Sequence, residues 1–88
     1  MSFQVEGKVA VVTGGSSGIG LAAVEILVAE GAKVAWCGRD EQRLAASKLY
    51  ILEKYPHANI FTSICNVLDK EDVKRFAQQV NQNLGNVD

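Results

Sequence analysis

The sequence has no excess of charge of either sign. Its 88 residues carry nine Lys and Arg against ten Asp and Glu, which gives a formal net charge of −1 at pH 7. Domains that grip nucleic acid usually carry a basic excess, and charged interaction tails appear as runs of one sign. The balance therefore excludes a chain built for nucleic-acid binding.

Long apolar runs are also missing. A membrane-spanning helix needs about 20 nearly uninterrupted apolar residues, and the longest such stretch, 19–29, is broken by Glu25. A signal peptide would place an apolar segment near the start, where the chain instead has Gln4, Glu6 and Gly7. We expect a cytoplasmic protein with no membrane contact.

Cysteine, histidine and proline are scarce. Cys37 and Cys65 are far apart and form no CxxC motif, so neither a disulfide framework nor a metal site is indicated. We expect both to be free thiols in the core. Pro56 ends a helical pattern, and His57, the one histidine, falls in the loop behind it. That position predicts a surface residue.

What the chain does have is an alternation of apolar runs and helical patterns. The first run, 8–13, is rich in β-branched residues without polar alternation, as in a strand buried on both faces of a parallel sheet. Short connections separate the elements. The patterns predict strands at 8–13, 33–37 and 60–65 and helices at 19–30, 41–55 and 69–84.

Helical spacing predicts which side chains these helices bury. For the first helix they are Ile19, Ala22, Ala23, Ile26 and Leu27. For the third helix they are Val73, Phe76, Ala77, Val80 and Leu84. We also expect Asp69 to cap the third helix with Asp72 as its reciprocal partner, and Gly85 to end it.

The resulting βαβαβα order predicts an α/β fold. It is a Rossmann-type, doubly wound parallel sheet in which only the first half is present, with three parallel strands in the order 3-2-1. Residues 1–88 are interpreted as a single partial dinucleotide-binding domain. The first strand, 9–12, would then be an exposed apolar edge, which proteins avoid. We expect a longer domain or a partner to cover it.

The most specific feature is the glycine-rich segment 13–20, which lies between a strand and a helix. Glycines allow a tight turn and a close approach of the backbone to a diphosphate, and the helix N-terminus favours anions. Leu21 follows Gly20, so the Lys of a Walker A loop is missing. The segment 18–23 fits GxGxxA, which predicts dinucleotide binding.

Thr13-Gly14-x-x-x-Gly18-x-Gly20 resembles the TGxxxGxG fingerprint of the classical short-chain dehydrogenase/reductase family. The resemblance covers the whole chain but only the opening part of a typical member. It implies that the cofactor's diphosphate and adjoining ribose are held by Gly14, Ser16, Ser17, Gly18, Ile19 and Gly20.

The end of the second strand bears on which nicotinamide cofactor is used. Enzymes that use NAD usually place a carboxylate there for the ribose 2′-hydroxyl, whereas NADP enzymes have an Arg nearby. Here Gly38 leaves room and Arg39 can bind a 2′-phosphate in bidentate fashion. Asp40 is the rival, as a ribose carboxylate; we interpret it as a helix N-cap. The prediction is NADP(H) rather than NAD(H).

The third strand ends at Asn66 and Val67, where the family commonly has Asp-Val. The resemblance implies that the Asn66 side chain and the Val67 amide reach the adenine ring. Asn66 departs from the family's Asp but keeps an oxygen acceptor and adds amide donors. The alternative is that Asn66 only forms a turn.

Tyr50 and Lys54 match the Tyr-x-x-x-Lys pattern of the family's catalytic pair, yet they lie on the second predicted helix. We predict that they are not catalytic, that Tyr50 packs with Leu49 and Leu52, and that Lys54 is solvated. The resemblance places the catalytic residues beyond the third helix, so none is expected in this chain.

The resemblance implies the N-terminal cofactor-binding part of an NADP(H)-dependent oxidoreductase acting on a small carbonyl or secondary alcohol, with a 3-oxoacyl thioester reductase as one option. The 88-residue chain alone is expected to be inactive, and the full-length form to be a homo-oligomer. A noncatalytic dinucleotide-binding or partner-assembled module remains an alternative. A methyltransferase is disfavoured because Gly38 and Arg39 replace the acidic residue that binds ribose hydroxyls.

Overall fold

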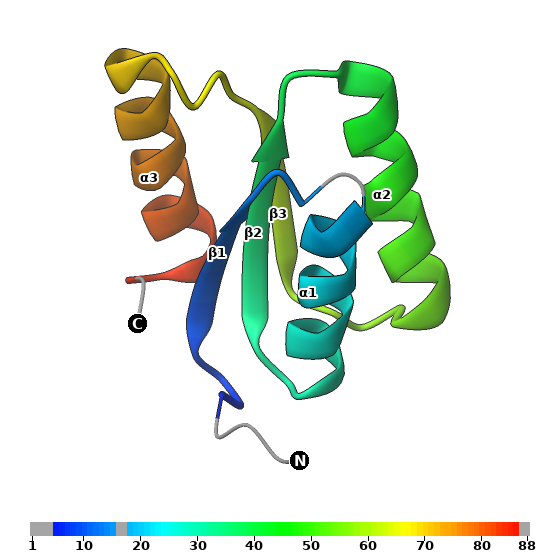
Figure 1. The fold of residues 1–88 in the computed structure, drawn as a ribbon. Helices are drawn as coiled ribbons and strands as arrows, with labels where there is room; N and C mark the ends of the chain where they lie inside the picture. Colours follow the sequence, from blue (N-terminus) through cyan, green and yellow to red (C-terminus); the bar gives the residue numbers. More distant parts are fainter. Residues whose placement is uncertain (1–4, 16–17, 87–88) are drawn as a thin grey trace.

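The computed structural model describes residues 5–15 and 18–86 and shows three parallel strands alternating with three helices. The sheet has the order β1-β2-β3, which is the predicted 3-2-1 order counted from the other edge. In Figure 1, α1 and α2 cover one face of the sheet and α3 covers the other. The elements are β1 (Val9–Thr13), α1 (Gly18–Ala29), β2 (Lys33–Gly38), α2 (Glu41–Lys54), β3 (Ile60–Ile64) and α3 (Lys70–Leu84).

The central strand β2 is buried on both faces and divides the core into two clusters. Val34 and Trp36 face α1 and α2, whereas Ala35 and Cys37 face α3, as expected from the alternation of side chains along a strand. The first cluster also contains Val24, Val28, Ala32, Leu44 and Ile51. The second also contains Val9, Cys65, Phe76 and Val80. All four of these β2 side chains are buried, which explains why residues 34–37 show no alternation of polar and apolar side chains.

Strand β1 is an edge strand, as predicted. Among the described residues it pairs with β2, and Val11 on it is 38% exposed.

In residues 5–15 and 18–86, no helix is long and apolar enough to cross a membrane.

The predicted buried face of α1 is wrong. Val24 and Val28 are the buried residues of this helix, and Leu27 packs against their cluster from a partly buried position. Ile19 and Ile26 are 90% and 50% exposed. The helix is apolar on nearly all sides, so its sequence fits more than one buried face, and packing against the sheet selects among them.

The prediction for α3 is better because this helix has one apolar face and one polar face. Phe76 and Val80 are buried, and Phe76 stacks on Phe61 with ring centroids 6.2 Å apart. Gly85 ends the helix with φ of 104°. Val73 is nonetheless 41% exposed, and Ala77 is exposed as well, so the buried face is narrower than predicted.

The N-cap of α3 is half as predicted. Asp69 Oδ1 accepts hydrogen bonds from the amides of Glu71 and Asp72 at 2.9 and 3.4 Å. Asp72 does not return a bond to the Asp69 amide; its Oδ2 accepts from the Asn66 amide at 3.1 Å, and the Asp69 amide donates to the Asn66 carbonyl. The short Asp side chain reaches past the cap to the end of β3.

Trp36 is the largest fully buried side chain and carries a polar group into the core. Its Nε1 donates to Ser47 Oγ at 2.9 Å, and the Ser47 hydroxyl donates to the Leu44 carbonyl at 2.7 Å. Ser47 on α2 is 1% exposed. A buried indole N–H needs such a partner, so Ser47 is required by Trp36 rather than by α2 itself.

We expect Ser47→Ala to destabilise the protein by about 1–3 kcal/mol, because it leaves the indole N–H buried without an acceptor. Adding Trp36→Phe should remove that part of the cost, since Phe has no donor to satisfy. The free energies of unfolding are measured in urea by circular dichroism. Equal stability of Ser47→Ala and the wild type would contradict the role of the hydroxyl.

Candidate functional site

The candidate site lies at the edge of the sheet where all three parallel strands end. The loops that follow β1, β2 and β3 meet there, at the top of Figure 1. In parallel α/β sheets the ligand binds outside the carboxyl ends of the strands. The predicted site residues all belong to these loops or to the first turn of α1, except that Ser16 and Ser17 lie outside the described residues.

The glycine turn after β1 contains positions that only glycine suits. Gly14 and Gly18 have φ of 70° and 61°, the left-handed region that favours glycine, and a Cβ on either would meet open space. Gly20 is different, because a Cβ there would overlap the Gly14 carbonyl oxygen and lie 2.8 Å from the Gly14 carbonyl carbon. The start of α1 is therefore packed directly against the end of β1.

The turn also rests on the core. A Cβ on Gly15 would lie 2.6 Å from the Cβ of Trp36, so the backbone at Gly15 lies flat on this side chain. The first turn of α1 contains no acidic residue, so its N-terminal amides meet no carboxylate of their own helix. Together these features form an uncharged backbone turn at a positive helix end, which fits an anion.

A second part of the site is a cavity of about 310 Å³ between the ends of β2 and β3. It is lined by Gly14, Cys37, Gly38, Arg39, Asp40, Arg43, Cys65 and Val67. The cavity thus joins the glycine turn, the loop after β2 and the loop after β3. Of the predicted residues, it brings Gly14, Arg39 and Val67 together.

Asp40 caps α2, as predicted. Its Oδ1 accepts from the amides of Gln42 and Arg43 at 2.9 and 3.2 Å. Its Oδ2 lies 3.9 Å from Arg43 Nε. Oδ1 is thus engaged with the start of α2, and Oδ2 is in a long, exposed ion pair. Within residues 5–15 and 18–86, the Arg39 side chain forms no hydrogen bond or ion pair.

Sequence reasoning missed Arg43. It lies three residues after the N-cap, and this spacing returns a side chain to the side of the cap residue. The signal was therefore present once Asp40 was read as an N-cap. Two guanidinium groups, Arg39 and Arg43, line the cavity.

Asn66 forms the turn that the alternative interpretation described. Its Oδ1 accepts from the Leu68 backbone amide at 3.0 Å, and its backbone N–H donates to Asp72 Oδ2. With the oxygen engaged, Asn66 offers a ligand mainly its Nδ2 donors. The next residue, Val67, is 49% exposed and lines the cavity.

The two cysteines form the apolar floor of the cavity, both free and both buried. Burial, and after it the neighbouring Cys65 thiol, raises the pKa of the Cys37 thiol from 9.0 to about 11. A backbone hydrogen bond from Gly14 acts in the opposite direction. The thiol therefore stays protonated and adds no charge beneath the two arginines.

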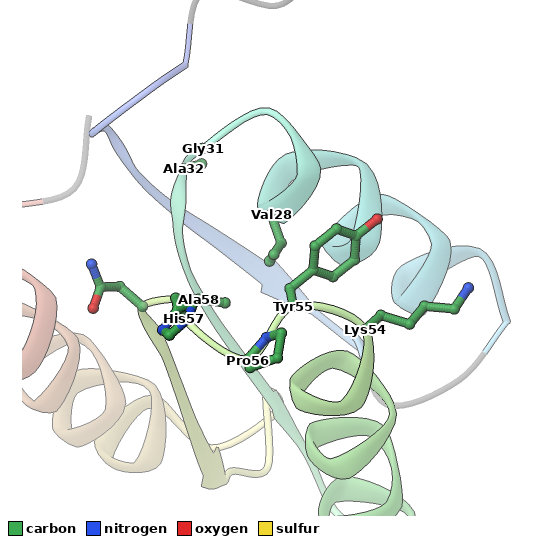
Figure 2. Close-up of a pocket in the computed structure, with 9 residues that line it drawn as sticks. Val28, Gly31, Ala32, Lys54, Tyr55, Pro56, His57 and Ala58 are labelled. Atoms are coloured by element: carbon green, nitrogen blue, oxygen red, sulfur yellow. The ribbon is translucent and has the colours of Figure 1, made fainter.

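A larger groove of about 390 Å³ lies at the opposite end of the sheet, where α1 and α2 end (Figure 2). It is lined by Tyr55, Pro56 and His57 among others, and His57 is exposed as predicted. It shares no lining residue with the 310 Å³ cavity. In residues 5–15 and 18–86, no group of three or more His, Cys, Asp or Glu could hold a metal ion.

Tyr50 and Lys54 lie on the side of α2 toward α1, where both contact Glu25, and not in the loops at the strand ends. The Tyr50 hydroxyl donates to Glu25 on α1 at 2.7 Å, a partner that was not predicted. Packing of its ring with Leu49 and Leu52 stays a prediction.

Known proteins resemble this chain in sequence and in fold. The family model for short chain dehydrogenases matches residues 8–88. An uncharacterised oxidoreductase of Staphylococcus saprophyticus is 41% identical over 85 residues, a match that covers 97% of this chain and 36% of the relative.

Solved structures give the same picture. An NADPH-bound short chain oxidoreductase of Pseudomonas aeruginosa, with an atypical catalytic centre, superposes with a TM-score of 0.92 at 48% identity, covering 94% of this chain and 32% of that one. A short chain dehydrogenase/reductase of Burkholderia phymatum in complex with NAD has a TM-score of 0.88 at 29% identity, over 97% of this chain and 30% of that one. The chain thus spans about a third of the length of these proteins.

We expect Gly20→Ala to destabilise the protein more than Gly18→Ala. The added methyl group at residue 20 overlaps a backbone carbonyl that cannot move without distorting β1. At residue 18 there is open space, and the cost is the left-handed backbone conformation alone, about 1–2 kcal/mol. Urea denaturation of both variants tests this order, and the reverse order would contradict the close packing at Gly20.

The Cys37 thiol predicts a loss of stability at alkaline pH. Its contribution is complete below pH 9.0, the value for an unperturbed thiol, and is lost as pH rises toward about 11, because the unfolded state loses its proton first. The slope for one proton is about 1.4 kcal/mol per pH unit. Cys37→Ala should abolish this part of the slope, while the contributions of Tyr and Lys residues remain. Superimposable plots of the free energy of unfolding against pH for the two proteins would contradict the prediction.

Proposed function

The chain belongs to the short-chain dehydrogenase/reductase family, and on that basis we propose that it binds the adenosine and diphosphate portion of NADP(H). The proposed protein is an oxidoreductase that interconverts a small carbonyl compound and a secondary alcohol. The observation that carries the cofactor preference is the pair Arg39 and Arg43 lining one cavity at the end of β2.

Local chemistry supports NADP(H) over NAD(H). A dehydrogenase that uses NAD needs a carboxylate that accepts hydrogen bonds from the ribose hydroxyls. Asp40 is the carboxylate at this place; its Oδ1 accepts from two amides at the start of α2, and its Oδ2 lies 3.9 Å from Arg43 Nε. A 2′-phosphate, in contrast, is suited to two guanidinium groups, of which Arg39 has no partner to exchange in the part of the chain that the structure describes.

The remaining contacts follow the loops. We assign the diphosphate and its ribose to Gly14, Ser16, Ser17, Gly18, Ile19 and Gly20. The turn fits because its backbone is bare at Gly14 and Gly18 and no acidic side chain lies at the start of α1. Asn66, through its amide donors, and Val67, through its backbone, are assigned to the adenine side.

The nicotinamide would supply the hydride when bound. The residues of this chain hold and orient the other end of the cofactor, and we assign no catalytic role to any of them. The chain spans about a third of the length of its relatives, so proton transfer and substrate binding are assigned to residues outside it. A 3-oxoacyl thioester as the substrate, a homo-oligomer as the assembled state and inactivity of the 88 residues alone are parts of the same proposal.

One observation favours a second candidate, a noncatalytic dinucleotide-binding module assembled with a partner. The edge strand β1 pairs with β2 on one side, and Val11 on it is 38% exposed. An apolar edge strand of this kind suits pairing with further polypeptide. Binding of NADPH without turnover in a protein that already contains every later family segment would favour this candidate.

Arg39→Ala tests the cofactor preference. We expect it to weaken NADPH binding by about 1.5–3 kcal/mol, the value of a lost charge-assisted hydrogen bond, and to change NADH binding little. Arg43→Ala should have the same selectivity with a smaller effect, because that side chain is shared with Asp40. Dissociation constants are measured by isothermal titration calorimetry.

Lys74→Ala is the matched control, since it removes an exposed cation on α3 at a distance from the cavity. It should leave both affinities unchanged. Equal losses of NADPH and NADH in Arg39→Ala would rule out the contact with the 2′-phosphate, and absence of binding of either dinucleotide to the wild type would overturn the proposed function.

A further inference from the structure

Three side chains connect α1 to α2 on the outer side of the sheet. We call Glu25, Tyr50 and Lys54 the interhelix cluster. Glu25 Oε1 accepts from the Tyr50 hydroxyl at 2.7 Å and from Lys54 Nζ at 3.3 Å, and Lys54 Nζ also donates to the Tyr50 hydroxyl at 2.9 Å. Each pair among the three groups is therefore in direct contact.

The donors and acceptors of the cluster match. The Tyr50 hydroxyl has one proton, which it gives to Glu25, and it uses an oxygen lone pair to accept from Lys54. The hydrogen bond from Tyr50 and then the one from Lys54 hold the pKa of Glu25 below its usual value. The hydrogen bond to Tyr50 and then the one to Glu25 raise the pKa of Lys54. The cluster is charged and complete at neutral pH.

Tyr50 also reaches the beginning of α1. With Gly18, Leu21, Ala22 and Glu25 it lines a cavity of about 220 Å³ along the first turns of that helix. Gly18 belongs to the glycine turn. Tyr50 is thus an α2 residue that borders the part of α1 to which we assign the diphosphate.

The proposed dinucleotide site is divided between the same two helices. Its diphosphate part is the turn that leads into α1, and its 2′-phosphate part, Arg39 and Arg43, lies at the beginning of α2. A ligand that touches both parts is sensitive to how the two helices are placed, because it makes both sets of contacts only when they are held at a matching separation.

We propose that Tyr50 is a positioning residue of the dinucleotide site. Through Glu25 and Lys54 it sets α2 relative to the start of α1, so that the glycine turn and the two arginines meet one ligand at the correct separation. This inference rests on the proposed function and assigns the Tyr-x-x-x-Lys pattern of α2 a role in binding instead of catalysis.

A positioning role and a general structural role predict effects on different ligands. NADPH contacts both helices under this proposal, whereas adenosine 2′-monophosphate reaches only the arginines of the α2 side and the adenine side. Loss of the cluster should therefore weaken NADPH and leave the monophosphate unchanged. A loss of overall structure would weaken both.

The experiment compares the wild type with Tyr50→Phe, which removes the hydroxyl and keeps the ring. We expect NADPH to bind about three- to tenfold more weakly, the equivalent of one net hydrogen bond, and adenosine 2′-monophosphate to bind as in the wild type. Glu25→Gln is a second variant with the same expected split. Affinities are measured by titration followed by NMR, which also reports whether the fold is retained.

Tyr55→Phe is the matched control, because Tyr55 lines the groove at the other end of the sheet. It should bind both ligands as the wild type does. Wild-type NADPH affinity in Tyr50→Phe, or equal weakening of both ligands, would overturn the positioning role while the proposed function stands. A wild type that binds neither ligand would instead overturn the proposed function and this inference with it.

Discussion

The contact between Trp36 and the glycine turn constrains the rest of the structure. Trp36 occupies the centre of β2 and is fully buried, so its ring cannot move aside. Gly15 lies against it, which sets the height of the turn above the sheet, and Ser47 pairs with its indole N–H, which sets where α2 lies. One side chain thereby relates the loop after β1 to the helix after β2, and these are the two parts that a dinucleotide would have to span.

The polar groups at the strand ends are arranged so that the site presents donors. Asp40 and Asn66 are two residues there with side-chain acceptors, and each uses an oxygen on backbone amides that follow it in the chain. What remains for a ligand is the bare backbone of the glycine turn, the amide group of Asn66 and the guanidinium groups of Arg39 and Arg43. The loops achieve this by local capping, and the result is a site suited to a ligand with several phosphates.

The sequence was sufficient for the features that depend on local chemistry. The alternation of strands and helices, the sheet order, the cap at Asp40 and the end of α3 at Gly85 all follow from the properties of single residues or short patterns. The buried face of α1 could not be predicted, because an almost wholly apolar helix has no preferred side until the sheet is in place. The contact of Tyr50 with Glu25 joins residues 25 positions apart, and no local pattern indicates such a pair. The role of Ser16 and Ser17 remains a prediction.

Overall similarity does not decide the cofactor. The fold superposes with a TM-score of 0.92 on an NADPH-bound structure and with 0.88 on one in complex with NAD, so fold similarity favours neither dinucleotide. The two cofactors differ by one phosphate on one ribose, and discrimination therefore has to come from the few side chains at the end of β2. In this chain Gly38 adds no bulk there, Asp40 is engaged with α2, and two guanidinium groups line the cavity. A buried or half-buried phosphate requires paired charge. We therefore expect this arrangement to weaken the binding of NAD(H), which lacks the 2′-phosphate, less than a carboxylate at this place would weaken the binding of NADP(H). The expected preference for NADP(H) is accordingly one of affinity, with NAD(H) bound more weakly rather than rejected.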